Sequence, residues 1–117
     1  MRHFDIEEFD SPDEISSGVN MDKEFLEMID NAREIAGVPF VITSGFRTKA
    51  HNKKVGGKED SAHLTGHAAD IKVGGSRQRY KIVEACIQAG FTRIGIASSF
   101  VHVDNDTTKA AEVIWTY

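Results

Sequence analysis

Cysteine, proline and long apolar runs are all scarce in this chain of 117 residues. Its one cysteine, Cys86, excludes an internal disulfide bond, and its place in a helical apolar pattern predicts a buried, inert thiol. No stretch approaches the roughly 20 apolar residues that a membrane-spanning helix requires, so we expect no membrane insertion. Lysine and arginine (14) are outnumbered by aspartate and glutamate (18), and the net charge of −4 argues against a nucleic-acid partner.

What is present is ordinary for a soluble globular protein, with 40% hydrophobic and 27% charged residues. Because linkers, repeats and low-complexity segments are absent, we expect a single domain over residues 1–117. Arg2 and His3 lead directly into an acidic segment, so we expect no cleaved signal peptide and synthesis in the cytoplasm. The sequence indicates no particular oligomeric state.

Helical periodicity is clearest over residues 21–36. Asn20 suits an N-cap, one face of the segment is apolar, and Gly37 is suited to end the helix. A second helix is predicted between Ser76 and Gly90, with an inner face formed by Tyr80, Val83, Cys86 and Ile87.

Short apolar segments predict a small sheet. The expected strands are 40–43, 70–73, 93–97, 100–104 and 113–117, and Ser98-Ser99 indicates a tight hairpin between the third and fourth. The predicted fold class is therefore α+β, with two main helices packed on a mostly antiparallel sheet and an N-terminal arm held by Phe4 and Phe9. The polar, lysine-rich segment 48–55 is either a mobile surface excursion or a substrate-facing loop with helical spacing.

The stretch from Ser61 to Asp70, SAHLTGHAAD, carries the strongest chemical signal. His63 and Asp70 offer a nitrogen and an oxygen ligand on either side of a turn at Gly66. In the later strand FVHVD, His102 and Asp104 share one face because side chains alternate along a strand. Two histidines and one carboxylate leave a fourth position open, which is typical of catalytic rather than structural zinc. We therefore predict that His63, Asp70 and His102 bind Zn²⁺.

These residues also carry a family resemblance. SAHLTGHAAD resembles the S-x-H-x-x-G-x-A-x-D signature of the zinc D-Ala-D-Ala carboxypeptidases and L-alanyl-D-glutamate endopeptidases, which share the hedgehog/DD-peptidase fold. The upstream SGFR, residues 44–47, is similar to that family's S-G-[FY]-R element, and FVHVD is similar to its last-ligand strand. The resemblance covers nearly the whole chain and is strongest to compact versions from phages and bacteria.

The resemblance implies roles for further residues. Arg47 would face the substrate, stabilising an oxyanion or binding a carboxylate, and Ser61 would shape the turn, help to hold substrate, or do both. Many relatives have an acid three residues before the last histidine, where this chain has Ser99. Asp104 is the best replacement as general base, and the competing interpretation is that Asp104 orients a ligand histidine.

The function implied is a zinc metallopeptidase that hydrolyses peptidoglycan stem peptides. Endopeptidase cleavage at L-alanyl-D-glutamate is favoured slightly over removal of a terminal D-alanine. As in a phage endolysin, we expect the protein to reach the cell wall after release from the cell or by another delivery route. The alternative is a non-catalytic zinc-binding module that recognises cell wall or a protein partner. The Ser99 departure favours that alternative, whereas the intact Arg47 element favours the enzyme.

Overall fold

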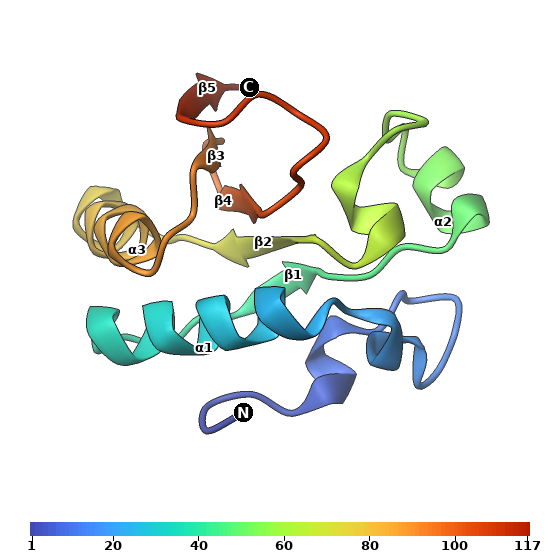
Figure 1. Cartoon of the computed structure of the whole chain (residues 1–117), viewed down its shortest axis with the longest axis horizontal. Helices are drawn as coiled ribbons and strands as arrows, with labels where there is room; N and C mark the ends of the chain where they lie inside the picture. Colours follow the sequence, from blue (N-terminus) through green and yellow to red (C-terminus); the bar gives the residue numbers. More distant parts are fainter.

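Two central strands, β2 (Ala68–Lys72) and β4 (Phe100–Asp104), pair antiparallel over their whole length in a computed structural model that describes all 117 residues (Figure 1). They belong to a five-stranded sheet with the order β1-β2-β4-β3-β5. The other strands are β1 (Ile42–Ser44), β3 (Arg93–Ile96) and β5 (Val113–Thr116). Only the β3–β5 pair is parallel. The predicted mostly antiparallel sheet is thus confirmed.

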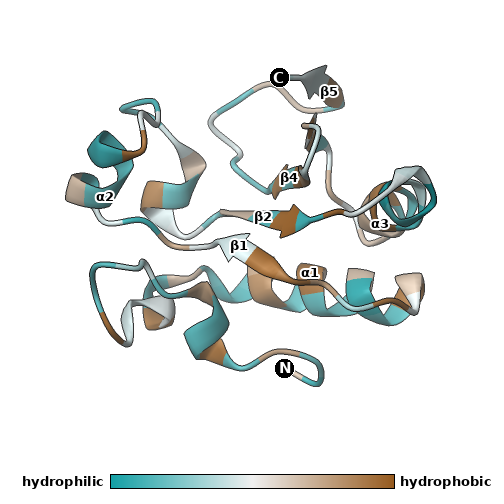
Figure 2. Cartoon of the chain, turned by 180° about the vertical axis from the view of Figure 1, so that it is seen from behind, coloured by the Kyte–Doolittle hydropathy of each residue, from teal (hydrophilic) through white to brown (hydrophobic).

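The sheet's two faces differ as strand alternation requires. Ala69, Ile71, Val101 and Val103 are fully buried and join the apolar core. Asp70, His102 and Asp104 alternate with them and therefore project from the opposite face. Figure 2 shows the apolar segments of β2 and β4 inside the molecule.

Two helices, α1 (Lys23–Ala36) and α3 (Ser76–Gln88), pack against each other and complete this core. Asp22 rather than Asn20 is the N-cap of α1, because residues 17–20 form a separate 3₁₀ turn and the Asp22 carboxylate accepts from the Phe25 amide. Gly37 ends the helix in the left-handed conformation, as predicted. The α+β class is confirmed.

The predicted inner face of α3 was partly wrong. Cys86 is buried, and its burial raises the pKa of the thiol to about 12, in keeping with an inert residue. Tyr80 and Ile87, however, are 68% and 51% exposed, and Ile82 and Ala85 are buried instead. At the surface, the Tyr80 hydroxyl donates to the Glu84 carboxylate.

The segment 48–55 does form a short helix, α2 (Lys49–Lys54), which stands beside the sheet (Figure 1). Three further 3₁₀ turns complete the chain: η1 (Ile6–Phe9), η2 (Ser17–Asn20) and η3 (Ala62–Thr65). Phe4 and Phe9 anchor the N-terminal arm in the core, as predicted. β1 begins two residues later than expected.

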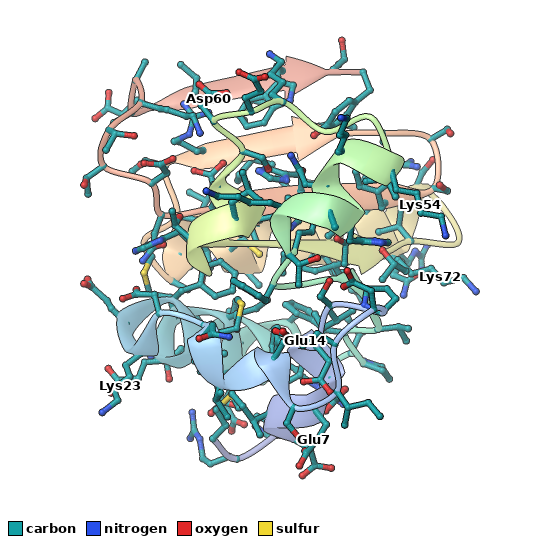
Figure 3. All side chains as sticks on the ribbon, turned by 90° about the vertical axis from the view of Figure 1, so that its right-hand side faces the viewer. Glu7, Glu14, Lys23, Lys54, Asp60 and Lys72 are labelled. Atoms are coloured by element: carbon teal, nitrogen blue, oxygen red, sulfur yellow. The ribbon has the colours of Figure 1, made fainter.

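Many charged side chains lie on the outside of the molecule. Lys23, Lys54 and Lys72, labelled in Figure 3, are exposed and point away from the core. None of the helices combines the length and the apolar character needed to cross a membrane.

Candidate active site

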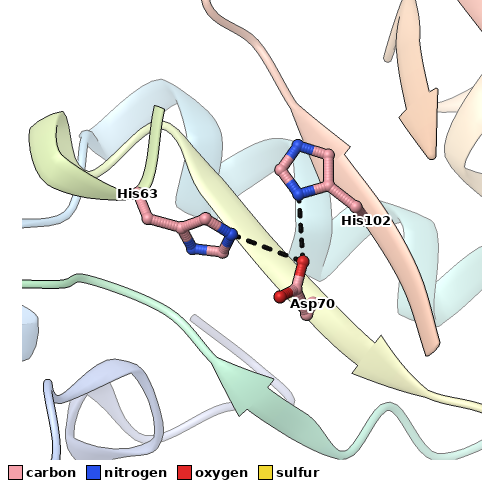
Figure 4. A group of neighbouring side chains, drawn as sticks. All are labelled: His63, Asp70 and His102. Carbon is pink, nitrogen blue, oxygen red and sulfur yellow. Dashed lines mark hydrogen bonds and ion pairs between the residues drawn. The ribbon is translucent and has the colours of Figure 1, made fainter. Parts of the chain in front are cut away.

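Three side chains meet above the central ladder (Figure 4). Asp70 and His102 are directly paired across β2 and β4, and His102 Nδ1 lies 2.9 Å from Asp70 Oδ1. His63 comes from η3, and its Nε2 lies 3.4 Å from the same oxygen. Their potential ligand atoms all lie within 4.8 Å of one another, and all three residues are buried. The structure thus brings together the three residues that the sequence predicts to be metal ligands.

The outer nitrogen of each histidine is held by an acceptor. His63 Nδ1 is 2.8 Å from the Gly45 carbonyl oxygen, and His102 Nε2 is 2.7 Å from Asp104 Oδ2. Metal-binding histidines usually donate their second N–H to such an acceptor, which fixes the ring and leaves the first nitrogen free to coordinate. The donor set of two oriented imidazoles and one carboxylate therefore fits a zinc ion.

The charges of the cluster are strongly coupled. Burial opposes ionisation of Asp70, but hydrogen bonds from His102 and His63 outweigh it and lower the pKa of the carboxyl group. Burial likewise disfavours the charged form of His102, yet its contacts with Asp104 and Asp70 raise the pKa of the imidazole. Both ring nitrogens of His102 thus face carboxylate oxygens, and a bound cation would take the place of the proton at Nδ1.

Asp104 itself is enclosed, with only 2% of its surface exposed. One oxygen contacts His102, and the other accepts from Arg93 Nε at 2.8 Å and from the Asp106 amide at 3.2 Å. Burial acts against ionisation, but the hydrogen bond with His102 keeps the pKa of Asp104 below its ordinary value. Both oxygens of Asp104 are engaged in holding its neighbours.

The SGFR element supports the cluster from the other side. Besides the Gly45 carbonyl that holds His63, the Arg47 amide donates to the His63 carbonyl at 3.0 Å. Gly45 is closely packed, because a Cβ atom there would lie 2.7 Å from Phe9 Cα. The Phe46 amide donates to the Phe9 carbonyl, so the N-terminal arm also helps to place this element.

The Arg47 side chain is held on three sides. Nε donates to Ser44 Oγ at 3.0 Å, Nη1 donates to Asn52 Oδ1 at 3.2 Å, and Nη2 lies 3.5 Å from Asp70 Oδ2. The guanidinium group is thereby placed beside the Asp70 carboxylate, where it can donate to an oxygen of a bound peptide.

A cavity of about 650 Å³ lies over the cluster, within the size range of ligand sites. One side is lined by the loop 55–62 and by Arg47, and the other by side chains of β3, β4 and β5. Phe100, Trp115 and Tyr117 give the strand side an aromatic wall. Gly95 makes room for this wall, because a Cβ atom there would lie 2.8 Å from the Trp115 ring.

The other predicted positions lie around this cavity or outside it. Ser61 lines it, and its hydroxyl caps η3 by accepting from the His63 amide. Ser99 is exposed in the β3–β4 turn and does not line the cavity. Two further histidines of these segments, His51 and His67, lie outside the metal cluster.

Sequence reasoning missed several residues of the site. Arg93 could have been found, since the two-residue hairpin turn places it opposite Asp104. Trp115 was assigned to a strand without a role, although its ring centroid lies 5.5 Å from that of His102. Asn52 stood in a polar segment with nothing to mark it as buried.

Comparison with known proteins identifies the family. A family model described as Peptidase M15 matches residues 2–104. The chain belongs to the Peptidase M15 family. This confirms the resemblance read from the signature and its two flanking motifs. The matched residues include all three members of the metal cluster as well as Arg47 and Asp104.

One relative from this comparison is the zinc D-Ala-D-Ala carboxypeptidase of Streptomyces albus G. It is 39% identical to the chain over 56 residues. That match covers 48% of this chain but only 22% of the relative, so this chain aligns with a small part of the relative's length.

Proposed function

We propose that this Peptidase M15 chain is a zinc metallopeptidase that hydrolyses an amide bond of a peptidoglycan stem peptide. The observation that carries the proposal is the His63–Asp70–His102 cluster, whose histidines are both oriented by outer acceptors, at the floor of an open cavity. The relative from Streptomyces albus G, named for zinc and for D-Ala-D-Ala, supports both the metal and the substrate class.

A zinc ion held by these three residues would supply Lewis acidity toward the scissile carbonyl and make water nucleophilic at neutral pH. Arg47 supplies a fixed positive charge beside the cluster for a carbonyl oxygen or a carboxylate of the substrate. Ser61 contributes a hydroxyl at the cavity wall, next to the histidine whose turn it caps.

Asp104 serves this reaction by orienting His102. Its engagement on both oxygens and its near-complete burial support this role over that of general base, the other role considered for it. Arg93 assists, since its Nε–H fixes the second Asp104 oxygen while its guanidinium stacks over Trp115 at 5.0 Å.

Within the stem peptide, we favour cleavage between L-alanine and D-glutamate. The cavity lining includes Lys58 besides Arg47, and these two cations suit a cut next to the side-chain carboxylate of D-glutamate. Removal of a terminal D-alanine is the second candidate, favoured by the name of the Streptomyces relative and by the suitability of Arg47 for a terminal carboxylate.

Digestion of purified muropeptides, followed by mass spectrometry, tests both levels of the proposal. We expect fragments from cleavage at L-alanyl-D-glutamate, abolished by a chelator and restored by added zinc. Arg47→Lys should lower kcat more than it raises KM, because lysine cannot reproduce the planar fork of donors.

Loss of a single D-alanine would instead identify a carboxypeptidase while leaving the zinc peptidase proposal intact. Wall binding with no hydrolysis by zinc-loaded protein would support the non-catalytic module and overturn the proposal.

A further inference from the structure

Asn52 is the only buried residue of α2, a helix that is otherwise exposed or half-buried. Just 4% of its surface is accessible. Burying a polar amide is unfavourable unless its hydrogen bonds are satisfied, so the contacts of Asn52 indicate what it does.

Those contacts join two parts of the same side of the cavity, Arg47 and the loop 55–62. Asn52 Oδ1 accepts from Arg47 Nη1 at 3.2 Å, and Nδ2 donates to the Lys58 carbonyl at 2.9 Å. The Gly57 amide also donates to the Asn52 main-chain carbonyl at 2.9 Å. One side chain thus holds both the guanidinium group and the loop 55–62 beside it. The amide orientation follows from chemistry, because only oxygen can accept from a guanidinium group.

Gly57 gives an independent reason to regard the contact between Asn52 and Arg47 as part of the site. A Cβ atom at residue 57 would lie 2.0 Å from Asn52 Oδ1 and 3.0 Å from Arg47 Nη1. The space that a larger residue would fill is therefore occupied by the Asn52–Arg47 pair. Here glycine permits close approach of two side chains to the backbone.

We infer that Asn52 is a positioning residue for the peptidase reaction, acting through Arg47. Together with Ser44 it fixes the guanidinium group in the direction of the cluster before substrate arrives, which spares the cost of ordering a long side chain on binding. This inference rests on the proposed function for its effect on turnover, but the state of Arg47 can be measured without turnover.

The first measurement is the rate at which phenylglyoxal modifies Arg47 in the zinc-loaded protein, read by peptide mass spectrometry. The exposed Arg77 on α3 serves as an internal reference. Asn52→Ala should raise the Arg47 rate several-fold and leave the Arg77 rate unchanged. Asn52→Asp keeps an oxygen acceptor for Arg47 and should keep the rate low.

Gly57→Ala tests the same contact with Asn52 intact, because the added methyl group must displace the amide. We expect it to raise the Arg47 rate as Asn52→Ala does. Lys53→Ala, on the exposed side of the same helix, is the matched control and should change nothing. Zinc content should be unchanged in all four variants, since none alters a residue of the cluster.

The second measurement is turnover of muropeptides. Loss of one hydrogen bond to a charged group should lower kcat/KM about tenfold in Asn52→Ala. Asn52→Asp should retain more activity than Asn52→Ala, which a purely structural role would not require.

Arg47 labelling at the wild-type rate in both Asn52→Ala and Gly57→Ala would overturn the inference, as would raised labelling with unchanged kcat and KM. If wild-type protein hydrolyses nothing, the proposed function fails, and the labelling rates still decide whether Asn52 positions Arg47.

Discussion

The two sides of the cavity are built by different means. On the sheet side, Asp70 and His102 occupy paired positions in a ladder that has neighbouring strands on both edges. On the loop side, His63 and Arg47 lie outside any strand and are held by the individual hydrogen bonds that they donate to Gly45, Ser44 and Asn52. Ladder geometry fixes many residues at once, whereas each loop contact depends on one or two groups.

This difference predicts which side of the cavity is more sensitive to single substitutions. On the sheet side, backbone pairing sets the spacing between the main-chain positions of two proposed ligands, and side-chain substitutions nearby leave that spacing in place. The loop side places one proposed ligand and the substrate-facing cation, and it requires close packing at Gly45 and Gly57. We expect single substitutions there to alter the position of functional groups more readily.

The largest expected effect is the same for both sides, because each side supplies at least one residue of the proposed zinc site. His102→Ala on the sheet side and His63→Ala on the loop side should both lose bound zinc, as measured by elemental analysis. His67→Ala is the matched control, since His67 lies in the same signature but outside the cluster. Undiminished zinc in both ligand variants would contradict the proposed metal site.

A smaller effect tests the sheet side alone. The Asp104 carboxylate contacts His102 with one oxygen and accepts from Arg93 Nε with the other. Asp104→Asn replaces this carboxylate with a neutral amide, so His102 loses its charged acceptor. Zinc affinity, measured by competition with a chelator, should fall about 10–100-fold. Unchanged affinity together with a turnover loss of about 10²–10⁴-fold would instead identify Asp104 as the general base.

The smallest expected effect concerns stability at the loop that follows β4. Burial opposes ionisation of Asp106, but hydrogen bonds from Lys109 and Thr108 lower its pKa from 3.8 to about 2. A lowered folded-state pKa stabilises the fold above the ordinary pKa, and this contribution disappears as pH falls toward about 2.

Asp106→Asn should therefore lower Tm slightly at neutral pH, and the difference from wild type should narrow below about pH 4. Thermal unfolding across this pH range measures it. A difference in Tm that is independent of pH would show that the Asp106 charge does not contribute.

Sequence could predict most of the sheet side. Alternation placed His102 and Asp104 on one face. The two-residue turn at Ser98-Ser99 could also have predicted that Arg93 pairs with Asp104, although this pairing was missed. On α3, the buried face was assigned partly to the wrong side of the helix. Tyr80 and Ile87 were expected to be buried but lie at the surface.

The loop side could be predicted only in part. Its motifs identified His63 and Arg47, but the contacts that hold them cross between segments with no shared periodicity. Gly45 meets Phe9 across a separation of 36 positions in the sequence, and Asn52 reaches Arg47 and Lys58 through a short polar helix. Such contacts follow from tertiary packing and leave no repeating pattern of residue types.

The part of the chain shared with Peptidase M15 ends at Asp104, the last residue of β4. The edge strand β5, which brings Trp115 to the cavity, follows after that boundary. Of the aromatic wall, Phe100 lies within the matched residues, whereas Trp115 and Tyr117 lie beyond them. The pairing that holds Asp70 beside His102 thus belongs to the matched part of the chain, and two of the three aromatic side chains over it do not.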